Sequence, residues 1–180
     1  MKSSLLLTCL LLFFTCSYSQ IFITRTGFIS FYSHTSLEDV KAENNQVYAV
    51  IDPAKKNIAF MLLMKSFSFE RELMQEHFNE NYAETDKFPK ATFNGTYTGD
   101  VDLTKNGIYN IVVSGALTIH GVTKNVQAPA TLEVNASILT GNAHFQVKPE
   151  DYNIIIPSLV RDKIAPAMDI NVKINCNPSK

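Results

Sequence analysis

The chain has 180 residues and a formal charge of −1, and it contains 12 Phe and 7 Tyr but no Trp. The near-neutral charge argues against nucleic acid as a partner, because domains that bind nucleic acid carry a basic footprint. Cys9 and Cys16 lie near the N-terminus, so Cys176 is the only cysteine in residues 20–180. This predicts neither an internal disulfide nor a cysteine-based metal site.

The first 19 residues have the layout of a secretory signal peptide. A lysine precedes an apolar run, and Ser17 and Ser19 occupy the positions that a signal peptidase reads. The run is shorter than the roughly 20 apolar residues that a membrane-spanning helix needs. We therefore predict cleavage after Ser19 and a periplasmic or secreted domain over residues 20–180, with no transmembrane helix. Removal of the single lysine changes the formal charge from −1 to −2. Cleavage before Cys16, which would give a lipoprotein, is the alternative.

Beyond residue 20, apolar residues recur at every second position, which is the period of half-buried strands. The pattern predicts strands near residues 21–34, 46–51, 57–66, 91–98, 109–120, 126–135, 142–147 and 168–176. Asp52 and Pro53 mark a turn between two of them. Pro129 has no N–H for a ladder, so it indicates a sheet edge or a bulge.

One segment breaks this period. Residues 68–82 contain no Gly or Pro, and their apolar residues recur at helical spacing. They predict one helix, capped by Ser68, that covers the sheet or closes one end of a barrel. One helix among many strands predicts an all-β, antiparallel fold whose sheet closes into a barrel or folds into a sandwich.

The stretch HGVTK, residues 120–124, joins two alternating runs. Gly121 supplies the positive φ of a tight turn, so a hairpin is favoured over a catalytic loop. The four histidines have no metal-site spacing, and no nucleophile elbow or phosphate loop is present. We therefore predict no catalytic residue, metal or cofactor, and a hydrolase or metal enzyme is the last hypothesis.

The interior of an eight-stranded barrel is filled by side chains or holds one small ligand. Small inward residues such as Gly95, Gly115 and Ala143 leave volume, which either aromatic rings or an apolar lipid tail could fill. For the second case the predicted lining is Phe60, Met74, Phe78, Phe93, Tyr97, Tyr109, Ile111, Val113, Leu117, Phe145 and Ile170. Arg161 and Lys163 are candidates for holding a head group at the rim.

Two blocks carry a resemblance to a known family. FPKATFNGTY, residues 88–97, and YNIVVSGALTIHGVTKNVQAPATLEV, residues 109–134, resemble the YceI-like family of bacterial secreted proteins. The resemblance implies a lipocalin-like, eight-stranded antiparallel barrel with a long apolar cavity. It also implies non-enzymatic binding of an isoprenoid-type amphiphile, such as an isoprenoid quinone or a polyprenyl phosphate.

Two questions stay open at this point. The alternative function is a structural or interaction module with a side-chain-filled barrel and no lipid ligand. Cys176 could be free or could pair with a second chain, and a homodimer is one expectation for the assembly.

Overall fold

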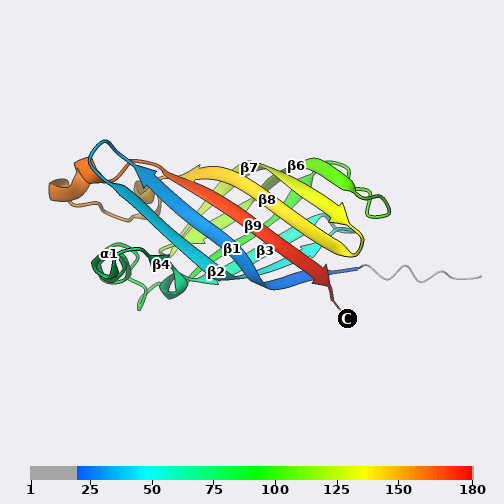
Figure 1. Cartoon of the computed structure of the whole chain (residues 1–180), viewed down its shortest axis with the longest axis horizontal. Helices are drawn as coiled ribbons and strands as arrows, with labels where there is room; N and C mark the ends of the chain where they lie inside the picture. Colours follow the sequence, from blue (N-terminus) through cyan, green and yellow to red (C-terminus); the bar gives the residue numbers. More distant parts are fainter. Residues whose placement is uncertain (1–19, 180) are drawn as a thin grey trace, which may run out of the picture.

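Eight long strands form one closed antiparallel sheet in the computed structural model, which describes residues 20–179 (Figure 1). The predicted signal peptide lies outside the described residues. Each strand pairs with its neighbours in the order β1-β9-β8-β7-β6-β5-β3-β2, and β1 also pairs with β2, which closes the barrel. The fold class predicted from the sequence is confirmed. The strands are β1 (Phe22–His34), β2 (Asp39–Asp52), β3 (Asn57–Leu63), β5 (Lys90–Thr98), β6 (Gly107–Ile119), β7 (Val122–Asn135), β8 (Ile138–Val147) and β9 (Met168–Pro178).

The two ends of the barrel differ in their connections. One end, which we call the mouth, carries the β1–β2 loop, the helical segment after β3, the β6–β7 turn and the β8–β9 segment, residues 148–167 (Figure 1). The other, which we call the closed end, carries the shorter turns between β2 and β3 and between β7 and β8, and the β5–β6 loop. Both ends of the described chain also lie there, since Phe22 pairs with Pro178.

Strand β2 begins earlier in the structure than the strand predicted near residues 46–51. The strand begins at Asp39 rather than near residue 46. Its first half includes Asn44, whose side chain is fully buried and donates through Nδ2 to the Leu63 carbonyl at 3.1 Å. A buried Asn breaks the apolar alternation, so the pattern hid a strand whose polar side chain is satisfied by hydrogen bonds.

The helix is also shorter than predicted. Ser68 does not cap it: β4 (Ser68–Phe69) pairs with β2, opposite Glu43 and Ala42. The α-helix α1 spans Glu72–His77, and a π-helical stretch, η2, continues it over Phe78–Tyr82. No helix among residues 20–179 is long and apolar enough to span a bilayer.

The β6–β7 connection is the predicted hairpin turn. Ile119 pairs with Val122, and the two residues between them, His120 and Gly121, have φ of 51° and 74°. Positive φ at both central positions is what a two-residue type I′ turn requires, and it matches the twist of the flanking strands.

Pro129 lies where β7 has a partner on one side only. It pairs with Val112 of β6, whereas pairing with β8 begins at the next residue, Ala130 opposite Ala143. The predicted edge at Pro129 is confirmed. Toward the mouth, β7 and β8 therefore part, and the wall is continued there by the segment that follows β8.

The closed end is filled by side chains. Its core comprises Phe22, Ala49, Ile51, Ile58, Phe93, Tyr97, Ile111, Leu132, Val134, Leu139, Ile174 and Cys176. Cys176 forms no disulfide within the described residues, and its thiol is fully buried, so this fold does not present it at the surface. Burial raises the pKa of this thiol to about 12, because desolvation disfavours the thiolate.

Candidate ligand-binding cavity

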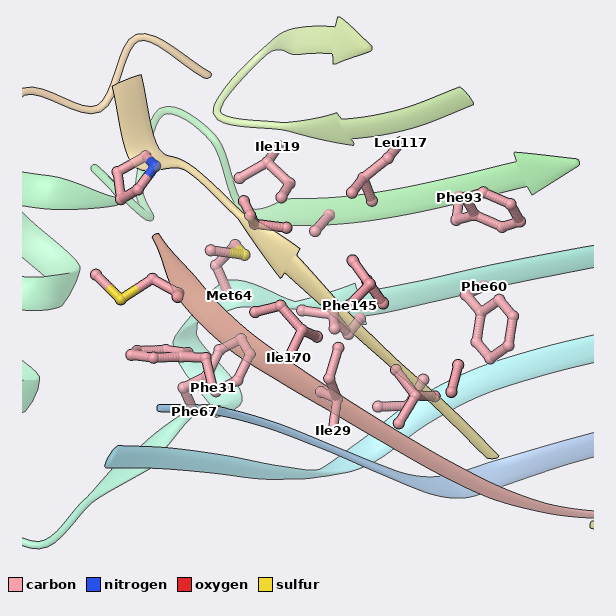
Figure 2. A pocket seen from close by; sticks show the side chains of 18 of the residues that line it. Ile29, Phe31, Phe60, Met64, Phe67, Phe93, Leu117, Ile119, Phe145 and Ile170 are labelled. Atoms are coloured by element: carbon pink, nitrogen blue, oxygen red, sulfur yellow. The ribbon is translucent and has the colours of Figure 1, made fainter. Parts of the chain in front are cut away.

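The mouth half of the barrel encloses a cavity of about 520 Å³. Figure 2 shows Ile29 and Phe31 of β1, Leu117 of β6, Phe145 of β8 and Ile170 of β9 projecting into one shared space. The floor consists of residues that also belong to the core of the closed end: Ile58, Phe93, Ile111, Leu132 and Ile174. The volume lies in the usual range for small-molecule sites, about 300–1,000 Å³.

A pair of glycines shapes the wall beside the floor. Gly95 of β5 lies directly opposite Gly115 of β6. A Cβ on Gly115 would stand 2.4 Å from the Asn94 carbonyl oxygen and 2.8 Å from the Phe93 ring. The close approach of the two strands therefore depends on glycine, and it lets the Phe93 ring lie over the backbone.

An aromatic cluster holds the helical segment on the barrel. Phe31 of β1 lies with its ring centroid 5.3 Å from Phe67, 5.7 Å from Phe69 and 5.6 Å from Phe78. Such distances are typical of favourable aromatic pairs. The cluster lines one side of the cavity, and Phe69 joins it from β4 rather than from the helix.

The β8–β9 segment forms another part of the wall. It contains two 3₁₀ helices, η3 (Pro149–Tyr152) and η4 (Ser158–Lys163). Ile154, Ile156 and Val160 line the cavity, and η3 packs against β7 where β8 has parted from it. This segment thus replaces β-sheet pairing as the cavity wall.

His120 connects three parts of the mouth. Its Nδ1 lies 3.1 Å from the carbonyl oxygen of the buried Tyr152, and its Nε2 lies 3.1 Å from Oε2 of Glu84. Hydrogen bonds from Lys87 and then from His120 hold the pKa of Glu84 below its usual value. The histidine side chain therefore serves as a structural link from the β6–β7 turn to η3 and to the chain that follows η2.

Three charged residues meet where the cavity opens. Arg71 donates a hydrogen bond to Glu38, and Lys163 Nζ lies 3.8 Å from Glu38 Oε2. The bond from Arg71, with the charges of Arg71 and Lys163, lowers the pKa of Glu38. All three residues line the cavity opening, so a mostly apolar chamber ends in a polar group with one excess positive charge.

Most residues predicted as lining do face the cavity. The wall includes Phe60, Met74, Phe78, Phe93, Ile111, Val113, Leu117, Phe145 and Ile170. The placement of Tyr97 and Tyr109 is wrong. Tyr97 is buried in the closed-end core, and the Tyr109 hydroxyl lies 3.1 Å and 3.0 Å from the carbonyl oxygens of Asp102 and Lys105. Both sit on the predicted inward face but below the floor, because alternation gives the face and not the depth along the barrel.

The two residues predicted to hold a head group differ in position, and that role stays a prediction. Lys163 lines the opening, whereas Arg161 lies on the exposed outside of η4 and does not contribute to the cavity wall. Glu38 and Arg71 were missed, since neither lies in a motif and they come together only through the fold. Among residues 20–179, no group of His, Cys, Asp and Glu is arranged to hold a metal ion.

One protein-family model matches this chain. The model of the YceI-like domain matches residues 21–176, which is most of the chain. The chain belongs to the YceI-like domain family. No curated protein matches the sequence.

Several solved structures are similar to this chain in fold. A polyisoprenoid-binding domain from Saccharophagus degradans, implicated in plant cell wall breakdown, has a TM-score of 0.75 at 15% identity, covering 88% of this chain and 98% of its own. BcnA of Burkholderia cenocepacia has a TM-score of 0.70 at 18% identity, covering 83% and 95%. The Campylobacter jejuni YceI protein has a TM-score of 0.65 at 18% identity, covering 82% and 90%. At these identities the likeness establishes the fold.

Proposed function

We propose that this YceI-like protein binds an amphiphilic isoprenoid-type lipid, an isoprenoid quinone or a polyprenyl phosphate, without catalysing a reaction. The observation that carries the proposal is the apolar cavity of about 520 Å³ that ends in the charged group Glu38, Arg71 and Lys163. The similarity to a polyisoprenoid-binding domain supports the same ligand class. The signal-peptide pattern supports a periplasmic or secreted site of action.

The chemistry of the cavity suits such a ligand. Each buried methylene contributes about 0.8 kcal/mol, so a long chain can bind well without a polar contact. A head group placed among Arg71 and Lys163 could accept charge-assisted hydrogen bonds. Glu38 already neutralises one of these cations, so of the two ligands the group suits the polar quinone head better than the phosphate, which carries a charge of about −1.5 to −2.

The alternative of a side-chain-filled interaction module has less support. Side chains fill the closed end, but the mouth half retains the cavity although many Phe rings surround it. A module that only presents its surface has no physical need for this void, because empty apolar volume lowers stability.

Native mass spectrometry of the purified protein, followed by solvent extraction, would test the proposal. We expect one isoprenoid species bound one to one. We expect Val113→Trp, which fills the cavity, to block uptake of added prenyl phosphate or quinone.

Val112→Trp is the matched control, because Val112 is the next residue of β6 and points to the opposite side of the sheet. A folded Val113→Trp variant that takes up lipid as well as Val112→Trp would contradict the proposal. So would an apo mass that does not change when lipid is added.

A further inference from the structure

Large apolar side chains are exposed around the mouth. Leu37 is 66% exposed, Leu73 61%, Ile155 80% and Leu159 92%. They stand on the β1–β2 loop, on α1 and on the β8–β9 segment, three parts of the chain that meet at the same end of the barrel (Figure 1). At the closed end, Ile108 is comparably exposed, at 69%, but the other exposed apolar residues there, Ile138 at 43% and Ile21 at 37%, are less exposed than those of the mouth.

These exposed residues adjoin the cavity wall. Leu73 lines the cavity, and Ile155 lies between Ile154 and Ile156, which both line it. Leu159 is followed by another lining residue, Val160. At Leu73, apolar surface therefore continues from the cavity to the mouth, and at Ile155 and Leu159 exposed apolar residues stand next to the cavity wall in the chain. An exposed apolar surface of this kind marks a site for a membrane or a protein partner.

We propose that the mouth rim, defined by Leu37, Leu73, Ile155 and Leu159, docks on a lipid bilayer. The inference rests on the proposed function, because a ligand that is insoluble in water must leave and re-enter a membrane. With the tips in the interface, a lipid tail passes from bilayer to cavity without crossing water.

The form of the rim favours a bilayer over a protein. The apolar tips project from separate segments and are divided by charged residues, Glu38 and Arg71 among them. A fluid interface accommodates separate apolar points, whereas a protein interface needs a packed, continuous core.

Charge at the rim is mixed. Arg161, two residues after Leu159, is exposed and makes no ion pair within the described part of the chain, so it is free to pair with a lipid phosphate. Glu70, Glu72 and Glu76 lie on or beside α1 and oppose attraction to anionic lipid. The apolar tips should therefore dominate, and docking should occur on zwitterionic and on anionic vesicles.

The test is flotation of the purified protein with vesicles of phosphatidylcholine and with vesicles of phosphatidylethanolamine and phosphatidylglycerol. We expect Ile155→Asp with Leu159→Asp to lower vesicle binding by about tenfold or more, because binding scales with the apolar area inserted. Leu37→Asp, on a different segment and outside the cavity wall, should also weaken it. Ile108→Asp is the matched control at the closed end and should leave binding unchanged.

Binding of geranyl phosphate in vesicle-free solution separates the two proposals. Wild-type protein that binds this soluble probe but does not float with vesicles would overturn membrane docking and leave the proposed function standing. Wild-type protein that floats but binds neither the probe nor longer prenyl lipids would support docking and contradict the function. Equal loss of flotation in Ile108→Asp would overturn docking, as would a stable dimer that Leu159→Asp splits without changing flotation.

Discussion

The closed end and the mouth end are built from the same eight strands, yet one is solid and the other hollow. At the closed end, Ile51, Leu139 and Ile174 are essentially inaccessible to solvent and belong to one hydrophobic core. At the mouth, the inward residues of the same strands stand around a cavity instead. The comparison shows that one alternating pattern can serve stability at one depth and ligand binding at another.

The difference arises from what lies beyond the strands. At the closed end, Val101 and Leu103 of the β5–β6 loop pack against the core. At the mouth, a helical segment and residues 148–167 stand at the edge of the barrel and line the space rather than fill it. The hollow half therefore depends on inserted segments for its wall, and the solid half does not.

The largest expected contrast is in thiol reactivity. Cys176 should react with N-ethylmaleimide only when the protein unfolds, because it is buried and its pKa is about 12. The unfolded fraction of a stable protein is about 10⁻³ or less, so native labelling should be slower than that of the denatured protein by at least about this factor.

Ala143→Cys, made in a Cys176→Ser background, is the counterpart in the cavity wall. It should label readily in the native protein and be protected by bound lipid. Rapid native labelling of Cys176 would mean that the closed end is not sealed.

A pair of leucine truncations should show the next contrast. Leu139 is fully buried, so Leu139→Ala should lower the free energy of unfolding by about 3 kcal/mol. Leu117 faces the cavity and is only half-buried, so Leu117→Ala should cost about 1 kcal/mol. Urea denaturation measures both, and equal losses would contradict the distinction between a solid and a hollow half.

The smallest expected effect concerns the link made by His120. Asn tolerates positive φ, so His120→Asn should keep the turn while it removes the contacts with Tyr152 and Glu84. We expect a loss of about 1 kcal/mol in the free energy of unfolding.

Faster amide exchange in residues 148–167 should accompany this loss, with the closed end unchanged. A uniform increase over the whole barrel would show that His120 supports the fold in general and not the mouth in particular.

Much of the barrel was predictable because strand faces follow from a period of two. On β6, Ile111, Val113 and Leu117 face the cavity as the sequence predicts, and His120–Gly121 forms the predicted turn. The start of β2 was hidden by the buried Asn44, and β4 was hidden by a segment that otherwise reads as helix. Local pattern cannot show that Phe69 packs against Phe31 from a strand, because that contact joins residues far apart in the sequence.

The site was less predictable than the fold. Depth along the barrel decides whether an inward residue lines the cavity or fills the core, and Tyr97 and Val113 differ in this way although they are partners across two strands. The rim depends on contacts between residues far apart in sequence, as Glu38 with Arg71 and Lys163 illustrates. No short-range pattern contains that information.

The seam between β1 and β9 determines when the molecule can finish folding. These are the first and last strands of the barrel, and they pair from Phe22 opposite Pro178 to Tyr32 opposite Asp169. A chain leaving a ribosome or a translocation channel therefore cannot close its barrel until β9 has emerged. Sheets dominated by such distant pairs fold in milliseconds to seconds. Until then β1 and β8 each keep an unpaired edge, which is the stage at which a holding chaperone would protect the chain from aggregation.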